Sequence, residues 1–126
     1  MTPREAFAEL SRGGRLVDIR PAAQRAAGGE IPGSVVVERN HLEWRLDPEC
    51  GARLPWVTGY EHRIIVFCMD GYTSSLAAAA LQDLGLSGAT DVIGGFRAWT
   101  AAGLPWAPAT ERTAELAPGA APAAPA

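Results

Sequence analysis

The sequence predicts an α/β fold of three layers, in which helices cover both faces of a mostly parallel sheet of four to five short strands. Short apolar runs rich in β-branched residues alternate with helix-forming segments along most of the chain, which is typical of parallel strands joined by crossover helices. These runs are continuous rather than alternating in polarity, as expected of strands that are covered on both faces. The length of 126 residues suits one domain with a substantial core.

The first predicted helix covers residues 3–10, because Thr2 is a good N-cap residue and Glu5 completes a capping box three positions later. Strands are predicted where apolar β-branched residues cluster, at 15–20, 35–37, 63–67 and 90–93. Further helices are predicted at 21–27, 42–46, 76–84 and 96–102. In the helix at 76–84 we expect Leu76, Ala80 and Leu84 to form the face that packs inward.

The composition argues against several classes of function. The formal net charge is −3 and the chain has no basic block, so we expect no nucleic-acid partner. No apolar run approaches the roughly 18–20 residues of a membrane span, and no signal peptide is apparent, so we expect a cytoplasmic protein without a membrane partner. All 11 cationic side chains are arginine, which argues against a Schiff-base lysine and a Walker-type phosphate loop.

The cysteines and histidines offer no metal-binding pattern. Cys50 and Cys68 lie 18 positions apart, and neither His41 nor His62 has a partner at the spacing of a zinc site. We therefore expect neither a metal nor an organic cofactor. Two cysteines also make no disulfide framework, which fits a reducing compartment.

The composition changes near residue 107. Residues 117–126 consist of alanine, proline and one glycine without apolar periodicity, and such a segment cannot bury a core. The predicted organisation is one domain at residues 1–106, followed by an alanine- and proline-rich tail at 107–126 that we expect to be disordered.

The stretch most informative about chemistry is 64–75, which reads as a buried strand, a tight loop that begins at Cys68, and the start of a helix. Gly71 permits a positive φ in the loop, and the hydroxyl residues at 73–75 are N-cap residue types. The loop amides and the helix N-terminus would then face the Cys68 sulfur, stabilise a thiolate and offer a site for an anion. The alternative is that Cys68 is a buried and inert cysteine.

Charged residues follow two of the predicted strands. Asp18 and Arg20 end the first strand, and Arg39 follows the second. Open parallel sheets place their sites at the carboxyl ends of the strands, so these side chains are candidates for the rim around Cys68, where the arginines would supply a positive field. A solvated ion pair or a helix cap is the alternative for Asp18 and Arg20.

Four segments resemble motifs of the rhodanese-like domain family, in the same order. Residues 16–20 resemble its Asp-x-Arg strand end, and residues 29–34 resemble its Gly-His-Ile-Pro-Gly-Ala turn. Residues 68–74 resemble its active-site loop, and residues 94–105 resemble its closing Gly-Gly and Trp segment. Each motif is weak alone, but four in order over about residues 3–106 are specific.

The resemblance implies a single-domain sulfurtransferase that works without a cofactor. In that family the loop cysteine, here Cys68, takes the outer sulfur of a donor such as thiosulfate as a persulfide and passes it to cyanide or a thiol. Asp18, Arg20 and Arg39 would support the site from the rim. The loop that would bind the substrate or the persulfide consists of Met69, Asp70, Gly71, Tyr72, Thr73 and Ser74.

The loop departs from the family at two positions. Members that use thiosulfate well often carry basic residues after the cysteine, where this chain has Met69 and Asp70. A negative charge beside an anion site opposes the binding of a dianion, so we expect weak activity with thiosulfate and a protein or small-molecule persulfide as the donor. The related phosphatases have a loop one residue longer that ends in arginine, whereas Thr73 stands here, so phosphatase chemistry is disfavoured.

Two other functions stay open at the level of the sequence. The domain could be a non-catalytic binding module, or Cys68 could be a thiol redox sensor whose sulfenate is resolved by Cys50. For a sulfurtransferase, the expected partners are a sulfur donor and a thiol or cyanide acceptor, and the expected assembly is a monomer or a weak homodimer. Participation of His41, which shares the rim with Arg39, also stays open.

Overall fold

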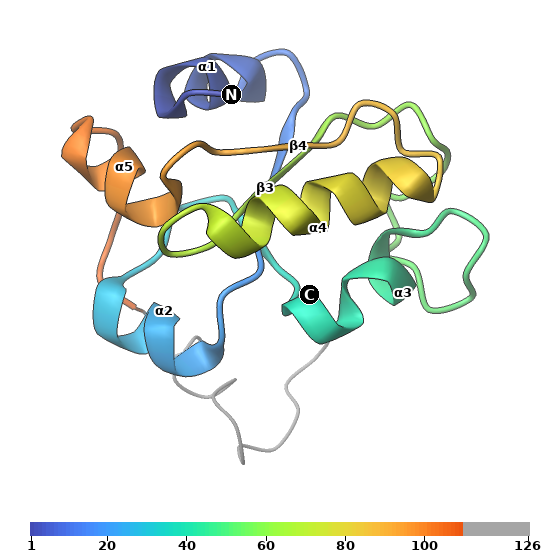
Figure 1. The fold of residues 1–126 in the computed structure, drawn as a ribbon, viewed down its shortest axis with the longest axis horizontal. Helices are drawn as coiled ribbons and strands as arrows, with labels where there is room; N and C mark the ends of the chain where they lie inside the picture. The colour runs from blue at the N-terminus through green and yellow to red at the C-terminus, as the bar shows by residue number, and fades with distance from the viewer. Residues whose placement is uncertain (110–126) are drawn as a thin grey trace.

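A computed structural model describes residues 1–109 of the chain and shows a sheet with helices on both faces (Figure 1). The strands are β1 (Arg15–Asp18), β2 (Val35–Val36), β3 (Ile64–Phe67) and β4 (Thr90–Asp91). The helices are α1 (Pro3–Leu10), α2 (Ala22–Gly28), α3 (Leu42–Leu46), α4 (Tyr72–Asp83) and α5 (Gly95–Ala101), with a 3-10 turn η1 (Arg39–His41) before α3. The predicted α/β class and three-layer arrangement are confirmed.

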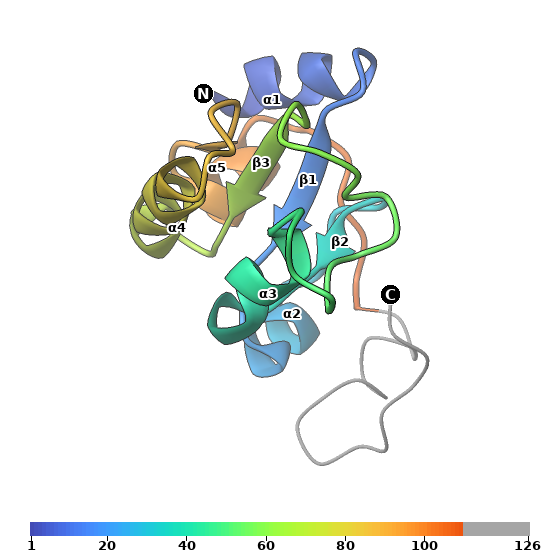
Figure 2. The ribbon, with the colours of Figure 1, turned by 90° about the vertical axis from the view of Figure 1, so that its right-hand side faces the viewer.

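The sheet is parallel throughout, with the strand order β2-β1-β3-β4. β1 and β3 pair along their whole lengths, from Arg15 opposite Ile64 to Asp18 opposite Phe67. In Figure 2 their arrows run side by side, away from α1 and toward α2 and α3. The segments that follow β1, β2 and β3 therefore meet at one edge of the sheet, where open α/β sheets place their sites.

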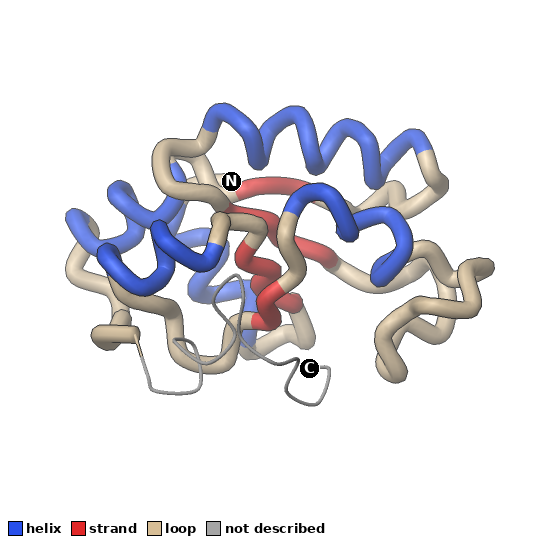
Figure 3. The backbone as a smooth tube through the Cα atoms, turned by 90° about the horizontal axis from the view of Figure 1, so that it is seen from below, coloured by secondary structure: helices blue, strands red, loops and turns tan. Residues whose placement is uncertain are grey.

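Alternation of side chains along β3 divides the apolar interior into two cores. Ile64 and Val66 face α3 and α4, whereas Ile65 and Phe67 face α1 and α5. All four residues are buried, which agrees with the continuous apolar run in the sequence. Figure 3 shows the strands in the middle of the molecule, with helices on either side.

Two predictions about burial were wrong. The strand at 35–37 was expected to be buried on both faces, but Val35 and Val36 are only half-buried because β2 is an edge strand that pairs with β1 alone. In α4 the buried face includes Ala77, Ala78 and Leu81, while Leu76 is 58% exposed. Apolar residues surround most of α4, so periodicity did not identify the inner face, and the small alanines allow a closer approach to the sheet.

Both ends of the described chain contact the sheet or its loops, since the Met1 ammonium donates to the Asp91 carbonyl and Ala107 pairs with Glu30. The capping box is confirmed, because the Thr2 hydroxyl accepts from the Glu5 N–H and the Glu5 carboxylate accepts from the Thr2 N–H. Of the tail expected at 107–126, Ala107 forms an antiparallel bridge with Glu30, and residues 110–126 lie outside the described residues. Within residues 1–109, no helix is both long enough and apolar enough to cross a membrane.

Candidate active site

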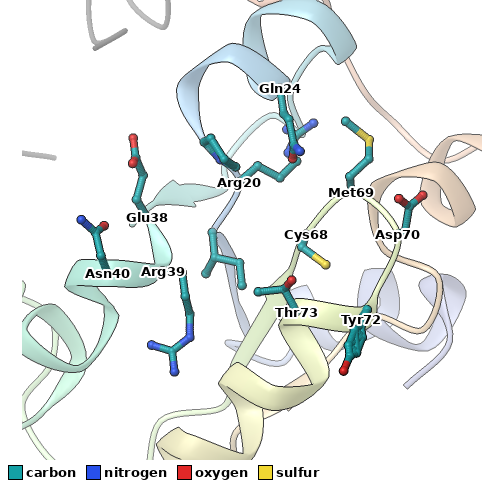
Figure 4. A pocket seen from close by; sticks show the side chains of 12 residues that line it. Arg20, Gln24, Glu38, Arg39, Asn40, Cys68, Met69, Asp70, Tyr72 and Thr73 are labelled. Carbon is teal, nitrogen blue, oxygen red and sulfur yellow. The ribbon is translucent and has the colours of Figure 1, made fainter. Parts of the chain in front are cut away.

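Cys68 directly follows β3 and lies at the edge of the sheet where the strands end. It is 8% exposed and belongs to the lining of a pocket of about 450 Å³ (Figure 4). Segments after β1 and β2 form one side of this pocket, and the loop between β3 and α4 forms the other. The lining residues are Ile19, Arg20, Pro21, Gln24, Glu38, Arg39, Asn40, Cys68, Met69, Asp70, Tyr72 and Thr73.

The sulfur of Cys68 is surrounded by hydrogen-bond donors of its own loop. The N–H of Gly71 donates to Sγ at 3.1 Å and the N–H of Ser74 donates at 3.4 Å. The Ser74 hydroxyl oxygen also lies 3.4 Å from Sγ, and it can donate when the sulfur is ionised. Ser74 is fully buried, so its two groups are shielded from water, whereas the Gly71 donor is partly buried.

The loop reaches this shape because Gly71 adopts a left-handed conformation, with φ of 95°. We expected the hydroxyl residues at 73–75 to cap the helix, but Gly71 is the N-cap and α4 begins at Tyr72. Ser74 therefore lies in the first turn, and its hydroxyl faces Cys68 rather than the helix end. A Cβ atom at position 71 would lie 2.7 Å from the Gly94 nitrogen, so the close approach of two segments also requires glycine here.

The start of α5 holds the outer side of the loop. The Phe96 N–H donates to the Cys68 carbonyl at 2.8 Å, and the Arg97 N–H donates to the Met69 carbonyl at 3.1 Å. These two hydrogen bonds hold the backbone of Cys68 and Met69, from which the loop continues to the Gly71 and Ser74 amides that donate to the sulfur. The sequence contained a signal for this contact in the glycine pair at 94–95, which lets the two backbones approach closely, but its role in the site was not predicted.

Asp18 and Arg20 form a buried pair of which only Arg20 reaches the pocket wall. Both side chains are fully buried, and the Arg20 guanidinium donates to the two carboxylate oxygens at 3.0 and 2.7 Å. Arg20 also donates to the Gly29 carbonyl at 2.8 Å and lies over the ring of Phe96. The alternative of a solvated ion pair is therefore wrong, and the charge that Arg20 would bring to the pocket is matched by Asp18.

The other charged residues of the pocket also have partners of opposite charge. Arg39 lies 2.8 Å from the Glu43 carboxylate, and Glu38 lies 3.9 Å from the guanidinium of Arg25. Asp70 forms an ion pair with Arg97 of α5. The lining thus carries two acidic and two basic side chains, and the positive field expected from Arg20 and Arg39 is largely offset.

The structure separates the predicted site residues into three groups. Cys68, Met69, Asp70, Tyr72, Thr73, Arg20 and Arg39 line the pocket. Gly71 and Ser74 are not among the lining residues, but their N–H groups donate to the Cys68 sulfur. Asp18 is not in the lining either, and it contacts the site only through its ion pair with Arg20. Sequence reasoning missed Gln24, Glu38 and Asn40, although they lie in the same post-strand segments as Arg20 and Arg39.

The remaining cysteine and the histidines lie outside this lining. Cys50 follows α3 in a turn and is a free thiol. The His41 ring stacks on Trp44 at a centroid distance of 5.6 Å, and His62 accepts from the Thr58 N–H at 3.3 Å. Among residues 1–109, no group of three or more histidine, cysteine, aspartate and glutamate side chains could hold a metal ion.

Comparison with known proteins gives consistent matches. The family model of the rhodanese-like domain matches residues 2–102. The thiosulfate sulfurtransferase GlpE of Stutzerimonas stutzeri is 34% identical over 97 residues, which cover 77% of this chain and 80% of that protein. GlpE of Actinobacillus succinogenes is 44% identical over a shorter stretch of 46 residues, which covers 36% of this chain and 41% of that protein.

Solved structures share the fold of this chain. A Rhodopseudomonas palustris protein of unknown function, described as a possible tyrosine phosphatase, is 34% identical with a TM-score of 0.75 over 84% of this chain and 82% of that one. A rhodanese-related protein of Thermoplasma volcanium shares the fold, with a TM-score of 0.65 and 21% identity over 86% of this chain and 97% of that one. The extent of the family match, together with the GlpE relative, establishes that this chain belongs to the rhodanese-like domain family.

Proposed function

We propose that this protein is a sulfurtransferase that carries a sulfane sulfur on Cys68. The observation that supports this most directly is the position of Sγ, which lies at a pocket and within hydrogen-bond distance of the Gly71 N–H, the Ser74 N–H and the Ser74 hydroxyl. Donors in this arrangement stabilise a thiolate and, after sulfur transfer, a persulfide anion. The naming of two relatives as thiosulfate sulfurtransferases agrees with this proposal.

The proposed reaction has two steps, each a displacement at sulfur. In the first, the Cys68 thiolate attacks the outer sulfur of the donor, a bond forms between the two sulfurs, and the remainder of the donor leaves with the electron pair of the broken bond. With thiosulfate the leaving group is sulfite. In the second step, an acceptor thiolate or cyanide attacks the outer sulfur and Cys68 leaves as a thiolate, so that the enzyme is regenerated in a ping-pong cycle.

We propose that thiosulfate is a poor donor and that a protein or small-molecule persulfide is the better one. Asp70 lines the pocket and is one of two acids there, so a dianion meets negative charge on entry. The pocket volume of about 450 Å³ lies within the range of pockets that hold organic ligands. It therefore has room for a donor larger than thiosulfate.

Phosphoester hydrolysis is not favoured by the residues present. In a phosphatase of this kind, an arginine at the end of the loop would bind the phosphoryl oxygens with two parallel hydrogen bonds, but Thr73 stands there in this chain. The two arginines of the lining are engaged by Asp18 and Glu43. We therefore do not extend to this chain the description of the Rhodopseudomonas palustris protein as a possible phosphatase.

The direct test is intact-mass measurement after incubation with thiosulfate or an organic persulfide. We expect a gain of one sulfur atom that is removed by cyanide, is absent in Cys68→Ser, and persists in Cys50→Ser as the matched control. Absence of an adduct with every donor would contradict the proposal and leave a non-catalytic binding module. A disulfide between Cys50 and Cys68 after mild oxidation, without any sulfur adduct, would indicate the redox sensor instead.

A further inference from the structure

We propose that Arg97 of α5 helps to determine which reactants reach Cys68 according to their charge. Its ion pair with Asp70 sets how strongly the pocket disfavours anionic reactants. The inference deepens the proposed function and rests on it, because it concerns the charge class of the sulfur donor. Arg97 belongs to the closing Gly-Gly and Trp segment and not to the active-site loop, and it comes near Cys68 only through the fold.

The position of Asp70 gives this pair its relevance to the site. Asp70 lies two positions after Cys68 and lines the same pocket. Figure 4 shows its carboxylate pointing away from the Cys68 sulfur, and the carboxylate pairs with the Nε atom of Arg97. The negative charge at the mouth of the pocket therefore has a partner that is 27 positions distant in the sequence.

The backbone of Arg97 is fixed against the loop, so this pairing follows from the fold. Its N–H donates to the Met69 carbonyl at 3.1 Å, and the preceding N–H of Phe96 donates to the Cys68 carbonyl at 2.8 Å. The side chain of residue 97 therefore starts beside Met69, next to Asp70. It also lines a second hollow that adjoins the Cys68 pocket at Met69 and Gln24.

The pair differs from the other charged pairs of the pocket in its exposure to solvent. Asp18 and Arg20 are fully buried and form a bidentate ion pair. The Arg39 and Glu43 side chains, on the opposite side of the pocket, are 37% and 40% exposed. The Arg97 and Asp70 side chains are 71% and 64% exposed, and an exposed pair of this kind is weak and exchanges its partners readily.

Two consequences follow for an approaching anion. While Asp70 holds Arg97, the guanidinium reduces the repulsion from Asp70 without presenting a free positive charge to the reactant. When Asp70 is replaced by a neutral residue, the same guanidinium is released and can attract the anion. The contribution of Arg97 to anion selection should therefore depend on whether the side chain at position 70 is an aspartate, and salt should weaken it because both side chains are exposed.

The experiment compares the alkylation of Cys68 by iodoacetate and by iodoacetamide, which form the same thioether bond, release iodide, and differ in charge. The ratio of the two rates, read on the Cys68 peptide, cancels any change in the reactivity of the sulfur that is common to both reagents. The variants are Asp70→Asn, Arg97→Gln and the double variant. The control is Glu9→Gln, which makes the same change of charge as Asp70→Asn but on α1, where the half-buried Glu9 pairs with the exposed Arg12.

We expect the iodoacetate-to-iodoacetamide ratio to rise about two- to five-fold in Asp70→Asn and to fall by a similar factor in Arg97→Gln, as the size of exposed ion-pair interactions implies. Arg97→Gln should lower the ratio more strongly when Asp70 is already Asn, and high salt should reduce every change. An unchanged ratio in Arg97→Gln in both backgrounds, or a change no larger than in Glu9→Gln, would overturn the inference.

Sulfur loading of the same variants by thiosulfate separates this inference from the proposed function. If the alkylation ratios change as expected but no variant takes up sulfur from thiosulfate or a persulfide, the proposed function fails and the charge selection by Arg97 stands. If Cys68 takes up sulfur and the ratios do not change, the proposed function stands and the role of Arg97 is wrong. If both hold, the order of the variants in thiosulfate loading should follow the order of their alkylation ratios.

Discussion

Ser74 presents both of its polar groups to Cys68, with its backbone nitrogen and its hydroxyl oxygen each 3.4 Å from the sulfur. The backbone donor belongs to the fold and would be present with any side chain at position 74. The hydroxyl is specific to serine, and because Ser74 is fully buried no water replaces it. This makes the hydroxyl the part of the sulfur environment that a substitution can remove selectively.

We therefore expect Ser74→Ala to slow the reaction of Cys68 with iodoacetamide at neutral pH by about four- to twelve-fold. A hydrogen bond to a charged group contributes roughly 1.5–3 kcal/mol, and about half of its loss is returned as higher intrinsic nucleophilicity of the less stabilised thiolate. The matched control is Ser75→Ala, because the Ser75 hydroxyl donates to the Tyr72 carbonyl and is exposed. Equal rates in the two variants would show that the hydroxyl does not act on the sulfur.

Gly71 and Gly33 allow the effect of backbone strain to be separated from the effect of a steric clash. Both have positive φ, 95° and 85°, so alanine at either position costs about 1–2 kcal/mol of unfolding free energy. A Cβ at Gly33 has no neighbour within 4 Å, whereas one at Gly71 lies 2.7 Å from the Gly94 nitrogen. In urea unfolding we expect Gly71→Ala to lower the free energy of unfolding clearly more than Gly33→Ala does.

The same two variants should differ at the site. Only Gly71→Ala displaces the amide that donates to Sγ at 3.1 Å, so only this variant should slow alkylation of Cys68. A Gly71→Ala protein as stable and as reactive as Gly33→Ala would contradict the contact with Gly94.

The sequence was sufficient to predict the central part of the fold and the place of the site. The apolar run of β3 is continuous, β1 contains the apolar pair Leu16-Val17, and the loop after β3 contains the glycine that its turn requires. Both the sheet and the edge at which Cys68 lies therefore followed from local patterns. The capping box at Thr2 and Glu5 was predictable for the same reason. These features depend on residues that are close together in the sequence.

Features that depend on the tertiary fold were not predictable. The Asp70 and Arg97 pair joins positions 27 apart and needs the contact between the loop and α5. The buried position of Arg20 involves contacts with the Gly29 carbonyl after α2 and with the Phe96 ring of α5, which no local pattern indicates. The helix start at Tyr72 was missed because the hydroxyl residues after it are good caps, while the conformation of Gly71 and the contact of Ser74 with the sulfur determine the actual boundary.

Charge reversal at the mouth of the pocket should improve the use of thiosulfate. Asp70→Arg removes a negative charge that lines the pocket and adds a positive one, and each exposed interaction contributes up to about 1 kcal/mol. We expect KM for thiosulfate to fall several-fold, and at most about thirty-fold, in steady-state assays with cyanide as acceptor. Glu9→Arg makes the same reversal on α1 and should leave KM unchanged, and an unchanged KM in Asp70→Arg would refute the charge argument.

Neutralising one member of the buried pair should destabilise the whole domain. Asp18→Asn leaves the Arg20 guanidinium buried without its counter-charge, and breaking a buried pair in this way costs about 3–5 kcal/mol. The exposed Asp83 at the end of α4 provides the control, since Asp83→Asn removes an unfavourable charge from a helix C-terminus and should leave the unfolding free energy unchanged or slightly higher. A loss below about 1 kcal/mol for Asp18→Asn in urea unfolding would contradict full burial of the pair.

The capping box should make stability depend on pH in the acidic range. The Thr2 N–H donates to the Glu5 carboxylate at 2.8 Å, and this hydrogen bond lowers the pKa of Glu5 below its ordinary value of 4.5. Because the pKa is lower in the folded state than in the unfolded state, ionised Glu5 stabilises the fold. That contribution is fully present above the ordinary pKa and is lost as the pH falls through the folded pKa.

We therefore compare the wild type with Glu5→Gln, which keeps an acceptor oxygen and a similar helix propensity but never carries the charge. In urea unfolding over a pH series, the wild type should be the more stable protein at neutral pH, and its advantage should shrink once the pH falls below 4.5. A difference between the two proteins that stays constant across this range would show that the ionised carboxylate of Glu5 does not contribute to the cap.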